Sequence, residues 1–282
     1  LGNGNITSSI VAVPVTGLDS GVVAIAAGDG HSCALLSTGA VKCWGRNSGG
    51  QLGNGRTTQS SVPVSVVGLD SAVVDISAGR SFTCAVLSTG AAKCWGENGI
   101  GVLGNGEMSD QPVTAPVQVA GLSSGVVSIS GGGEHTCAVL STGAVKCWGF
   151  NYFGQLGNGD TITSSVPVSV VGLDSGVVSV SAGSYHTCAV LSTGGIKCWG
   201  WNEAAQLGIG KQQFVPVPEP VSVVGLDSAA VQVSAGSGHS CALLSTGGAM
   251  CWGNNYYGQV GTGTTGTVEP WPVPVVGLGS GV

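Results

Sequence analysis

The sequence predicts an all-β protein, a β-propeller of four-stranded blades. One block of about 50 residues is written five times, most clearly as HSCALLSTGAVKCWG at 31–45. The first cysteine of each copy stands at 33, 84, 137, 188 and 241, so the intervals are 51, 53, 51 and 53 residues. Repeats of this length are typical of solenoids and propellers. Each copy holds four short apolar segments between glycine turns and no helical period, which favours propeller blades.

The repeat at 156–206 illustrates the four expected strands. Val166–Val171 is a short apolar strand after a turn-rich lead, and VVSVSAG at 177–183 alternates apolar and polar residues as a half-buried strand does. HTCAVL and GIKCWG then form the two arms of a hairpin. The sequence therefore predicts two single strands and one hairpin per repeat.

The hairpin turn fixes which residues face each other. If 37–39 (Ser-Thr-Gly) is a three-residue loop with its glycine in the left-handed conformation, Leu36 pairs with Ala40. Continuing this register pairs Leu35 with Val41, Ala34 with Lys42, and finally Cys33 with Cys43. Directly opposed side chains have Cβ atoms about 4.5–5.5 Å apart, close to the distance a disulfide needs.

The ten cysteines therefore form five C-x9-C pairs with none left over. We predict five disulfides, Cys33–Cys43, Cys84–Cys94, Cys137–Cys147, Cys188–Cys198 and Cys241–Cys251; five pairs of buried thiols are the alternative. A structural zinc would need four ligands close together, whereas one hairpin offers two. Disulfides persist in oxidising compartments, so we expect an extracellular or cell-envelope location.

Composition excludes several functions. Only 8% of the residues are charged, against about 25% in typical domains, and the net charge is −6. Four of the eight basic residues occupy one repeat position (Lys42, Lys93, Lys146, Lys197), so no basic stripe remains for nucleic acid. No apolar run is long enough for a membrane span.

The repeated string S-A-G-x-x-H-[ST]-C-A-[LV]-L-S-T-G…C-W-G-x-N-x-x-G-Q-L-G-N-G resembles the regulator of chromosome condensation (RCC1-like) family of propellers, with bacterial-type CWG and GQLGNG repeats. The resemblance covers essentially the whole chain and implies the propeller fold. It says less about function, since family members include a chromatin-bound exchange factor, a photoreceptor and a secreted enzyme inhibitor. The paired cysteines and the acidic balance disfavour nuclear exchange activity.

The family usually closes its ring with seven blades. We expect one propeller domain over 1–282, with repeats at about 1–51, 52–102, 103–155, 156–206 and 207–259 and a partial sixth at 260–282. Seven blades at this period need roughly 360 residues. The five complete repeats are therefore expected to belong to a six- or seven-bladed ring; an open ring, or one closed by another chain, is the alternative. Because the chain opens within a motif, we expect a processed product or part of a longer protein.

Recurring polar residues are interpreted as structural. Histidine fills one slot in four copies (His31, His135, His186, His239) and phenylalanine fills it in the fifth (Phe82), which fits packing against a neighbouring backbone better than metal binding. Aspartates after a Gly-Leu pair (Asp19, Asp70, Asp174, Asp227) suit turns better than a calcium site. The recurring CWG tryptophans are expected in the core or between blades. No catalytic set, cofactor site or metal site is predicted, so the protein is expected not to be an enzyme.

The aromatic residues that do not repeat indicate a binding surface. Nine of the ten aromatics outside the CWG motif lie at or beyond position 150, and six follow CWG in the third to fifth repeats. Equivalent loops of successive blades lie side by side, so we predict an aromatic patch that binds a partner; filling of gaps between blades is the alternative. The candidate residues are Phe150, Tyr152, Phe153, Tyr185, Trp201, Tyr256 and Tyr257.

These observations favour a non-enzymatic, extracellular protein-interaction module on a disulfide-stapled scaffold. A structural subunit of a cell-surface assembly is the first alternative, with self-association in place of a discrete ligand. A carbohydrate-binding propeller, with a glycan stacked on the aromatic rings, is the second.

Overall fold

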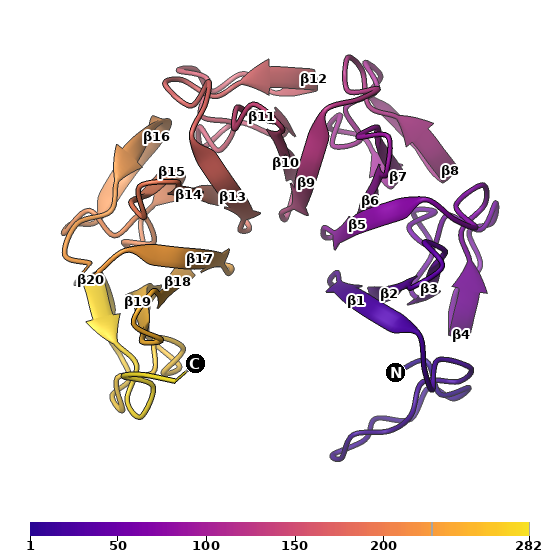
Figure 1. Cartoon of the computed structure of the whole chain (residues 1–282), viewed down its shortest axis with the longest axis horizontal. Coiled ribbons are helices and arrows are strands. Elements are labelled where there is room, and N and C mark those ends of the chain that lie inside the picture. Colours follow the sequence, from indigo (N-terminus) through magenta and orange to yellow (C-terminus); the bar gives the residue numbers. More distant parts are fainter. Residues whose placement is uncertain (227, 282) are drawn as a thin grey trace. The chain divides into compact units, whose positions relative to one another are not determined.

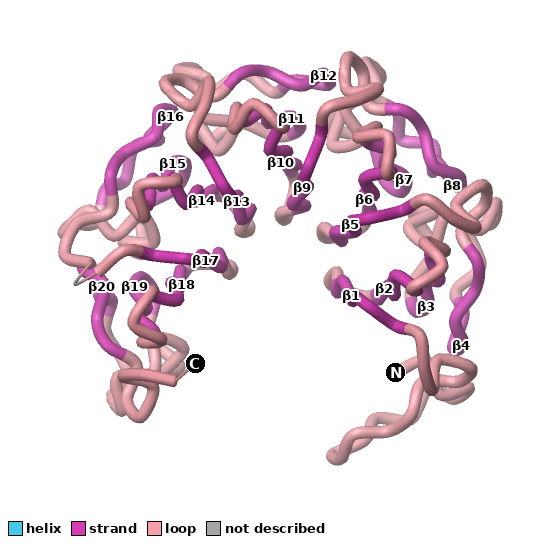
Figure 2. The backbone as a smooth tube through the Cα atoms, in the orientation of Figure 1, coloured by secondary structure: helices cyan, strands magenta, loops and turns pink. Residues whose placement is uncertain are grey.

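The protein is built from strands and loops. The computed structural model describes residues 1–226 and 228–281; Asp227 and Val282, the last residue of the partial sixth unit, lie outside the described residues. The described part contains twenty strands and no helix (Figure 2). These strands form five four-stranded antiparallel sheets in which sequential strands are neighbours (Figure 1). The prediction of an all-β fold made of four-stranded blades is confirmed.

The strands of the first sheet are β1 (Val22–Ala27), β2 (His31–Leu36), β3 (Val41–Gly45) and β4 (Ser60–Ser65). Those of the second are β5 (Val73–Ala78), β6 (Phe82–Leu87), β7 (Ala92–Asn98) and β8 (Ser109–Gln118). Those of the third are β9 (Val126–Gly131), β10 (His135–Leu140), β11 (Val145–Gly149) and β12 (Ser164–Ser169). Those of the fourth are β13 (Val177–Ala182), β14 (His186–Leu191), β15 (Ile196–Asn202) and β16 (Gln213–Ser222). Those of the fifth are β17 (Ala230–Ala235), β18 (His239–Leu244), β19 (Ala249–Asn254) and β20 (Val268–Pro274).

The chain divides into two compact units. The first comprises Leu1–Gly131 with Ser164–Pro167, and the second comprises Gly132–Thr163 with Val168–Val282. The single domain over 1–282 and its repeat boundaries stay predictions. Across residues 1–226 and 228–281, no helical segment has the length and apolar character needed to cross a bilayer.

The central hairpin has the predicted register. In β2 and β3, Cys33 faces Cys43, Ala34 faces Lys42 and Leu35 faces Val41. The N–H of Leu36 donates to the carbonyl of Ala40 at 2.9 Å, which closes the three-residue loop. Gly39 in that loop has φ of 79°, and a Cβ there would lie 2.5 Å from the Ala72 backbone nitrogen, so both conformation and space require glycine.

The fourth strand of each sheet comes from the lead segment of the following repeat. In the fourth sheet, β16 lies against β15, with Cys198 facing Val221. The expected strand at Val166–Val171 likewise corresponds to β12, the last strand of the third sheet. In the fifth sheet, β20 lies within the partial sixth repeat, and its Val273 faces Cys251 of β19. A structural blade therefore combines residues of two sequence repeats.

The core of each unit lies between neighbouring sheets. In the first unit, Cys33, Leu35 and Val41 of the first hairpin pack with residues of the second sheet that include Ile76 and Trp95. In the second unit, the β14–β15 hairpin packs in the same way against the fifth sheet. The recurring tryptophans are buried, with Trp95, Trp148, Trp199 and Trp252 at 0% exposure and Trp44 at 8%. Their predicted place in the core is confirmed.

Each hairpin carries one disulfide. The five pairs are Cys33–Cys43, Cys84–Cys94, Cys137–Cys147, Cys188–Cys198 and Cys241–Cys251, as predicted. These cysteines are buried except for Cys241, which is half-buried, and the Cα atoms of each pair lie 4.0–4.1 Å apart. The bridges therefore join directly opposed strand residues in or beside the core.

Removing one bridge is expected to destabilise the fold measurably. The double variant C188A/C198A should lower the free energy of unfolding by about 2–3 kcal/mol, because an 11-residue loop is no longer closed in the unfolded chain. Denaturant titration without reductant measures this difference. Lys197→Ala, which changes a neighbouring residue and leaves the bridge intact, should change the free energy by less than about 0.5 kcal/mol. A double variant as stable as the parent would contradict a stabilising role for the bridge.

Candidate functional site

The loop that follows each CWG motif is held rigidly by a buried asparagine. In the third repeat, the N–H of Leu156 donates to Oδ1 of Asn151 at 2.9 Å. The side-chain amide of Asn151 in turn donates to the carbonyls of Asp160 and Ile162, each at 3.1 Å. Asparagine occupies the same slot, also buried, in the other repeats (Asn47, Asn98, Asn202, Asn255). Sequence reasoning missed this role, although an asparagine stands three residues after the tryptophan of every CWG motif.

Five of the seven candidate aromatics form one cluster in the second unit, which we call the aromatic surface (Phe150, Tyr152, Phe153, Tyr185, Trp201). Phe153 is at its centre, with ring centroids 4.5 Å from Trp201, 5.1 Å from Tyr185 and 5.3 Å from Tyr152. Phe150 joins the cluster through Phe153 at 6.1 Å. Tyr152 is 67% exposed, whereas the other four rings are half-buried. The cluster is thus a packed layer of rings with one face in solvent.

The two remaining candidates lie elsewhere in the fifth repeat. Tyr256 is 58% exposed and lines a cleft that Trp201 also lines. Tyr257 is 90% exposed, and among the described residues neither tyrosine has a ring contact with the aromatic surface. The seven predicted residues therefore divide into a five-ring cluster, one cleft residue and one separate tyrosine.

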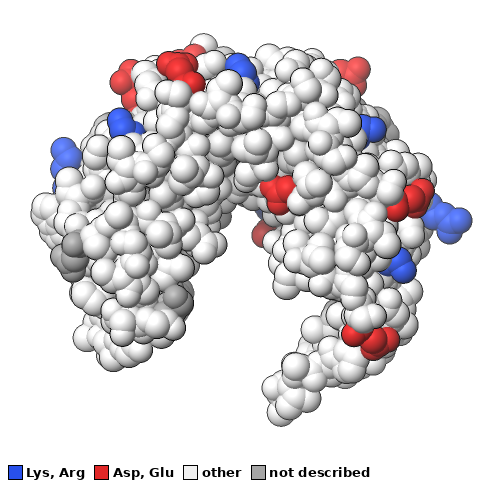
Figure 3. Space-filling model, in the orientation of Figure 1, with Lys and Arg blue, Asp and Glu red and all other residues white. Residues whose placement is uncertain are grey.

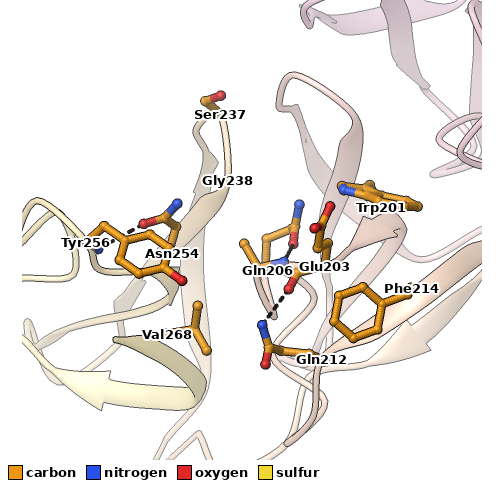
Figure 4. Close-up of a pocket in the computed structure, with 11 residues that line it drawn as sticks. Trp201, Glu203, Gln206, Gln212, Phe214, Ser237, Gly238, Asn254, Tyr256 and Val268 are labelled. Carbon is orange, nitrogen blue, oxygen red and sulfur yellow. Dashed lines mark hydrogen bonds between the residues drawn. The ribbon is translucent and has the colours of Figure 1, made fainter. Parts of the chain in front are cut away.

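The cleft has a volume of about 470 Å³ and lies between the fourth and fifth sheets of the second unit (Figure 4). One wall comes from the end of β15, the turn after it and the start of β16, and carries Trp201, Glu203, Ala204, Gln206, Gln212 and Phe214. The facing wall comes from the β17–β18 turn, the end of β19 and the start of β20, and carries Ser237, Gly238, Asn254, Tyr256 and Val268. Sequence reasoning did not predict this cleft.

Hydrogen bonds fix the polar side chains of the cleft. Oε1 of Gln206 accepts the N–H of Ala204 at 2.9 Å, and Oδ1 of Asn254 accepts the N–H of Tyr256 at 2.9 Å. Nε2 of Gln212 donates to the carbonyl of Glu203 at 2.7 Å. The amide nitrogens of Gln206 and Asn254 point away from these bonds (Figure 4). The cleft therefore presents amide donors together with the Glu203 carboxylate and the amide oxygen of Gln212 as acceptors.

A smaller cleft in the first unit lies between the loops that follow CWG in the first and second repeats. Its volume is about 190 Å³, and its lining includes Gly49, Glu97 and Asp110. It contains no aromatic side chain. The aromatic lining thus distinguishes the 470 Å³ cleft of the second unit from this smaller one.

The recurring histidines are part of buried hydrogen-bond chains. Nε2 of His186 lies 2.8 Å from Oγ of Ser240, which itself donates to the carbonyl of Gln206 at 2.9 Å. Because the hydroxyl has one proton and gives it to the carbonyl, the histidine must donate from Nε2. His31 and His135 bond threonine hydroxyls (Thr83 and Thr187) in the same way, each at 2.8 Å. The expected backbone partner is therefore wrong: a hydroxyl side chain stands between the imidazole and the backbone.

Burial keeps these histidines neutral. Desolvation lowers the pKa of His135 and His186 to about 3, and the charges of His135 and His239 add to the effect at His186. Burial lowers the pKa of His31 to about 4, opposed in part by the charge of Asp29. Nδ1 of His31, His135 and His186 is buried without a hydrogen-bond partner in the described part of the chain, and at neutral pH these rings do not take up a second proton there. Their geometry fits a structural role.

Charge is sparse over the molecule. The face drawn in Figure 3 carries scattered acidic and basic side chains on a mostly uncharged surface. Arg80 and Asp29 form an exposed ion pair at 3.7 Å. Among residues 1–226 and 228–281, no three His, Cys, Asp or Glu side chains are grouped closely enough to hold a metal ion.

The comparisons with known proteins agree on one family. The family profile described as RCC1-like domain matches residues 1–281. The ultraviolet-B receptor UVR8 of Arabidopsis thaliana is 34% identical over 266 residues, which cover 93% of this chain and 60% of UVR8. The human E3 ubiquitin-protein ligase HERC2 is 32% identical over 255 residues, or 88% of this chain and 5% of HERC2. The chain thus spans 60% or less of these curated relatives.

Solved structures share the fold at lower identity. Human WBSCR16 matches with a TM-score of 0.81 at 22% identity, over 92% of this chain and 67% of that protein. Yeast RCC1 (Prp20), crystallised with Kap60, matches with a TM-score of 0.77 at 20% identity, over 91% of this chain and 64% of that chain.

The buried histidines predict acid sensitivity. Unfolded histidine binds a proton below a pH of about 6.5, whereas folded His186 stays neutral down to a pKa of about 3, so stability falls as the pH drops through this window. His186→Phe, which copies Phe82 of the second repeat, removes this contribution. Between about pH 7.5 and about pH 4.5, the variant should lose about 2–3 kcal/mol less unfolding free energy than the parent.

Denaturant titration at the two pH values measures this difference. Lys146→Ala, which removes a side chain bonded to Ser169 at the surface, is the control and should retain the parent's pH dependence. If His186→Phe were as acid-sensitive as the parent, the buried neutral histidine would not be a source of that sensitivity.

Proposed function

We propose that this chain, which belongs to the RCC1-like domain family, is a non-enzymatic binding module that holds a protein partner on its aromatic surface. The observation that carries the proposal is the packing of four rings around Phe153 with Tyr152 left 67% exposed. Exposed aromatics that are ordered before binding lose little side-chain entropy and are common anchors of protein interfaces.

The scaffold supports this role because it leaves the outer loop positions free to vary. The first position after CWG is Arg46, Glu97, Phe150, Trp201 or Asn254 in the five repeats, while the next residue is always the buried asparagine. Side chains at the variable positions can therefore change without loss of the loop. A surface built this way suits recognition of a partner rather than catalysis.

A related structure, the disulfides and the low charge further support the proposal of a protein-binding module. Yeast RCC1 was crystallised bound to Kap60, a protein. The five disulfides suit an oxidising setting, and we propose an extracellular or cell-envelope location. Sparse charge also suits an interface in which few ions must be desolvated.

Photocrosslinking tests where a partner binds. A benzoylphenylalanine at position 152 of the full chain should capture one discrete protein from the culture medium or envelope fraction of the source organism. The same probe at Ser48, the matched exposed position of the first repeat, is the control and should not capture it. Equal capture at both positions would overturn the proposal.

The captured protein then allows affinity to be measured with purified components. Tyr152→Ala should weaken binding by about 30-fold, since exposed anchor rings contribute about 2 kcal/mol. Ser48→Ala should leave the affinity unchanged. An unchanged affinity for Tyr152→Ala, or capture of a second copy of this chain alone, would contradict binding of a distinct protein partner at the aromatic surface.

A further inference from the structure

The cleft of the second unit exists because two side chains of the aromatic surface have small counterparts one repeat later. Phe153 and Tyr185 pack against each other at 5.1 Å. Their counterparts in the next repeat are Ala204 and Gly238. A Cβ added at Gly238 would lie 3.8 Å from Cβ of Ala204, an ordinary contact, so these two positions face each other as the two rings do. The space that two aromatic rings fill in one repeat is therefore empty in the next.

The walls of this space combine aromatic rings with planar polar groups. Phe214 is 67% exposed and Tyr256 is 58% exposed, so both rings can be covered by a ligand. The amide groups of Gln206 and Asn254 lie on opposite walls and supply donors, while the carboxylate of Glu203 supplies acceptors (Figure 4). The volume of about 470 Å³ falls in the range of small-ligand sites, about 300–1,000 Å³.

This combination selects the chemistry of the ligand. No Lys or Arg lines the cleft, and Glu203 would repel an anion. An entirely apolar ligand would leave Glu203, Gln206 and Asn254 without partners. A cation would be attracted to Glu203 but would face two amide donors. A pyranose ring has an apolar C–H face that can stack on an aromatic ring and hydroxyl groups that both donate and accept.

We propose that the cleft is a saccharide site for a neutral pyranose residue of a glycan. The C–H face of the sugar stacks on Phe214, which is the more exposed of the two rings. Its hydroxyl groups accept from Gln206 and Asn254 and donate to Glu203. The saccharide site is separate from the proposed protein-binding site, which is the aromatic surface, although Trp201 belongs to both sites.

Calorimetric titration of the full chain tests the site. The probes are oligosaccharides of glucose, galactose, mannose and N-acetylglucosamine. At least one should bind with a dissociation constant of about 10 mM or lower. The double variant A204F/G238Y refills the cleft with the rings of the preceding repeat and should weaken this binding at least about tenfold. The backbone at Gly238 is not left-handed, so it accepts a side chain there.

A second variant tests the site in case the bulky side chains of A204F/G238Y prevent folding. Phe214→Ala removes one exposed ring and should weaken sugar binding about tenfold at an unchanged melting temperature. Val215→Ala, the matched control, changes the next residue of β16, which is also exposed and does not line the cleft, and should bind sugar like the parent.

The outcomes separate this proposal from the proposed protein partner. Tyr152→Ala should keep the parent's sugar binding and bind the protein about 30-fold more weakly, whereas Phe214→Ala should bind sugar about tenfold more weakly and keep the parent's affinity for the protein. The saccharide site is overturned if no probe sugar binds, or if folded A204F/G238Y binds sugar as the parent does. It is also overturned if Nα-acetyl-lysine methylamide, a cationic side-chain probe, occupies the cleft and displaces the sugar.

Discussion

The structure depends on buried backbone carbonyl groups that each accept two hydrogen bonds from the next sheet. In the second unit, the carbonyl of Gln155 accepts from Nε1 of Trp199 and from Oγ1 of Thr187, both at 2.9 Å. The carbonyl of Gln206 does the same with Trp252 and Ser240. A carbonyl has two lone pairs, so this arrangement satisfies it fully in the protein interior. It fixes the loop after one CWG motif against the tryptophan of the next.

These hydrogen bonds explain why the buried positions carry the same or similar residues in successive repeats, whereas the exposed positions vary. The tryptophan, the hydroxyl residue and the histidine form one connected chain of hydrogen bonds, and removing the hydroxyl residue would leave the buried Nε2–H of the histidine without an acceptor. The histidine itself can be replaced by an apolar ring, as Phe82 shows in the second repeat. The positions one, three and four residues after CWG lie outside this chain. Arginine, glutamate, phenylalanine, tryptophan and asparagine all occur at the first of them without disturbing the buried asparagine behind it. Variation at these positions can therefore build a binding surface on an unchanged framework.

Local geometry could be predicted from the sequence, and non-local geometry could not. The register that sets Cys33 opposite Cys43 follows from one turn and two short strands, all within the 15 residues of 31–45. The place of the fourth strand in its sheet escaped prediction because this strand pairs with the hairpin of the preceding repeat, which no short-range pattern specifies. The partner of the histidines is also non-local: His186 and Ser240 are 54 residues apart. Only the period of the repeat connects them in the sequence.

The aromatic surface and the cleft differ in the size of the residues at one pair of equivalent repeat positions. Where the pair is Phe153 and Tyr185, the two rings pack together, fill the space between two loops and form part of the aromatic surface. Where it is Ala204 and Gly238, the space stays empty and the rings around it become walls. The sequence predicted the aromatic surface because its aromatic residues depart from the repeat. It did not predict the cleft, because an alanine and a glycine 34 residues apart indicate a site only when the fold is known to place them face to face. In a repeat protein, a small residue where other copies have a large one is as informative as the reverse, since both change the surface while the buried framework stays fixed.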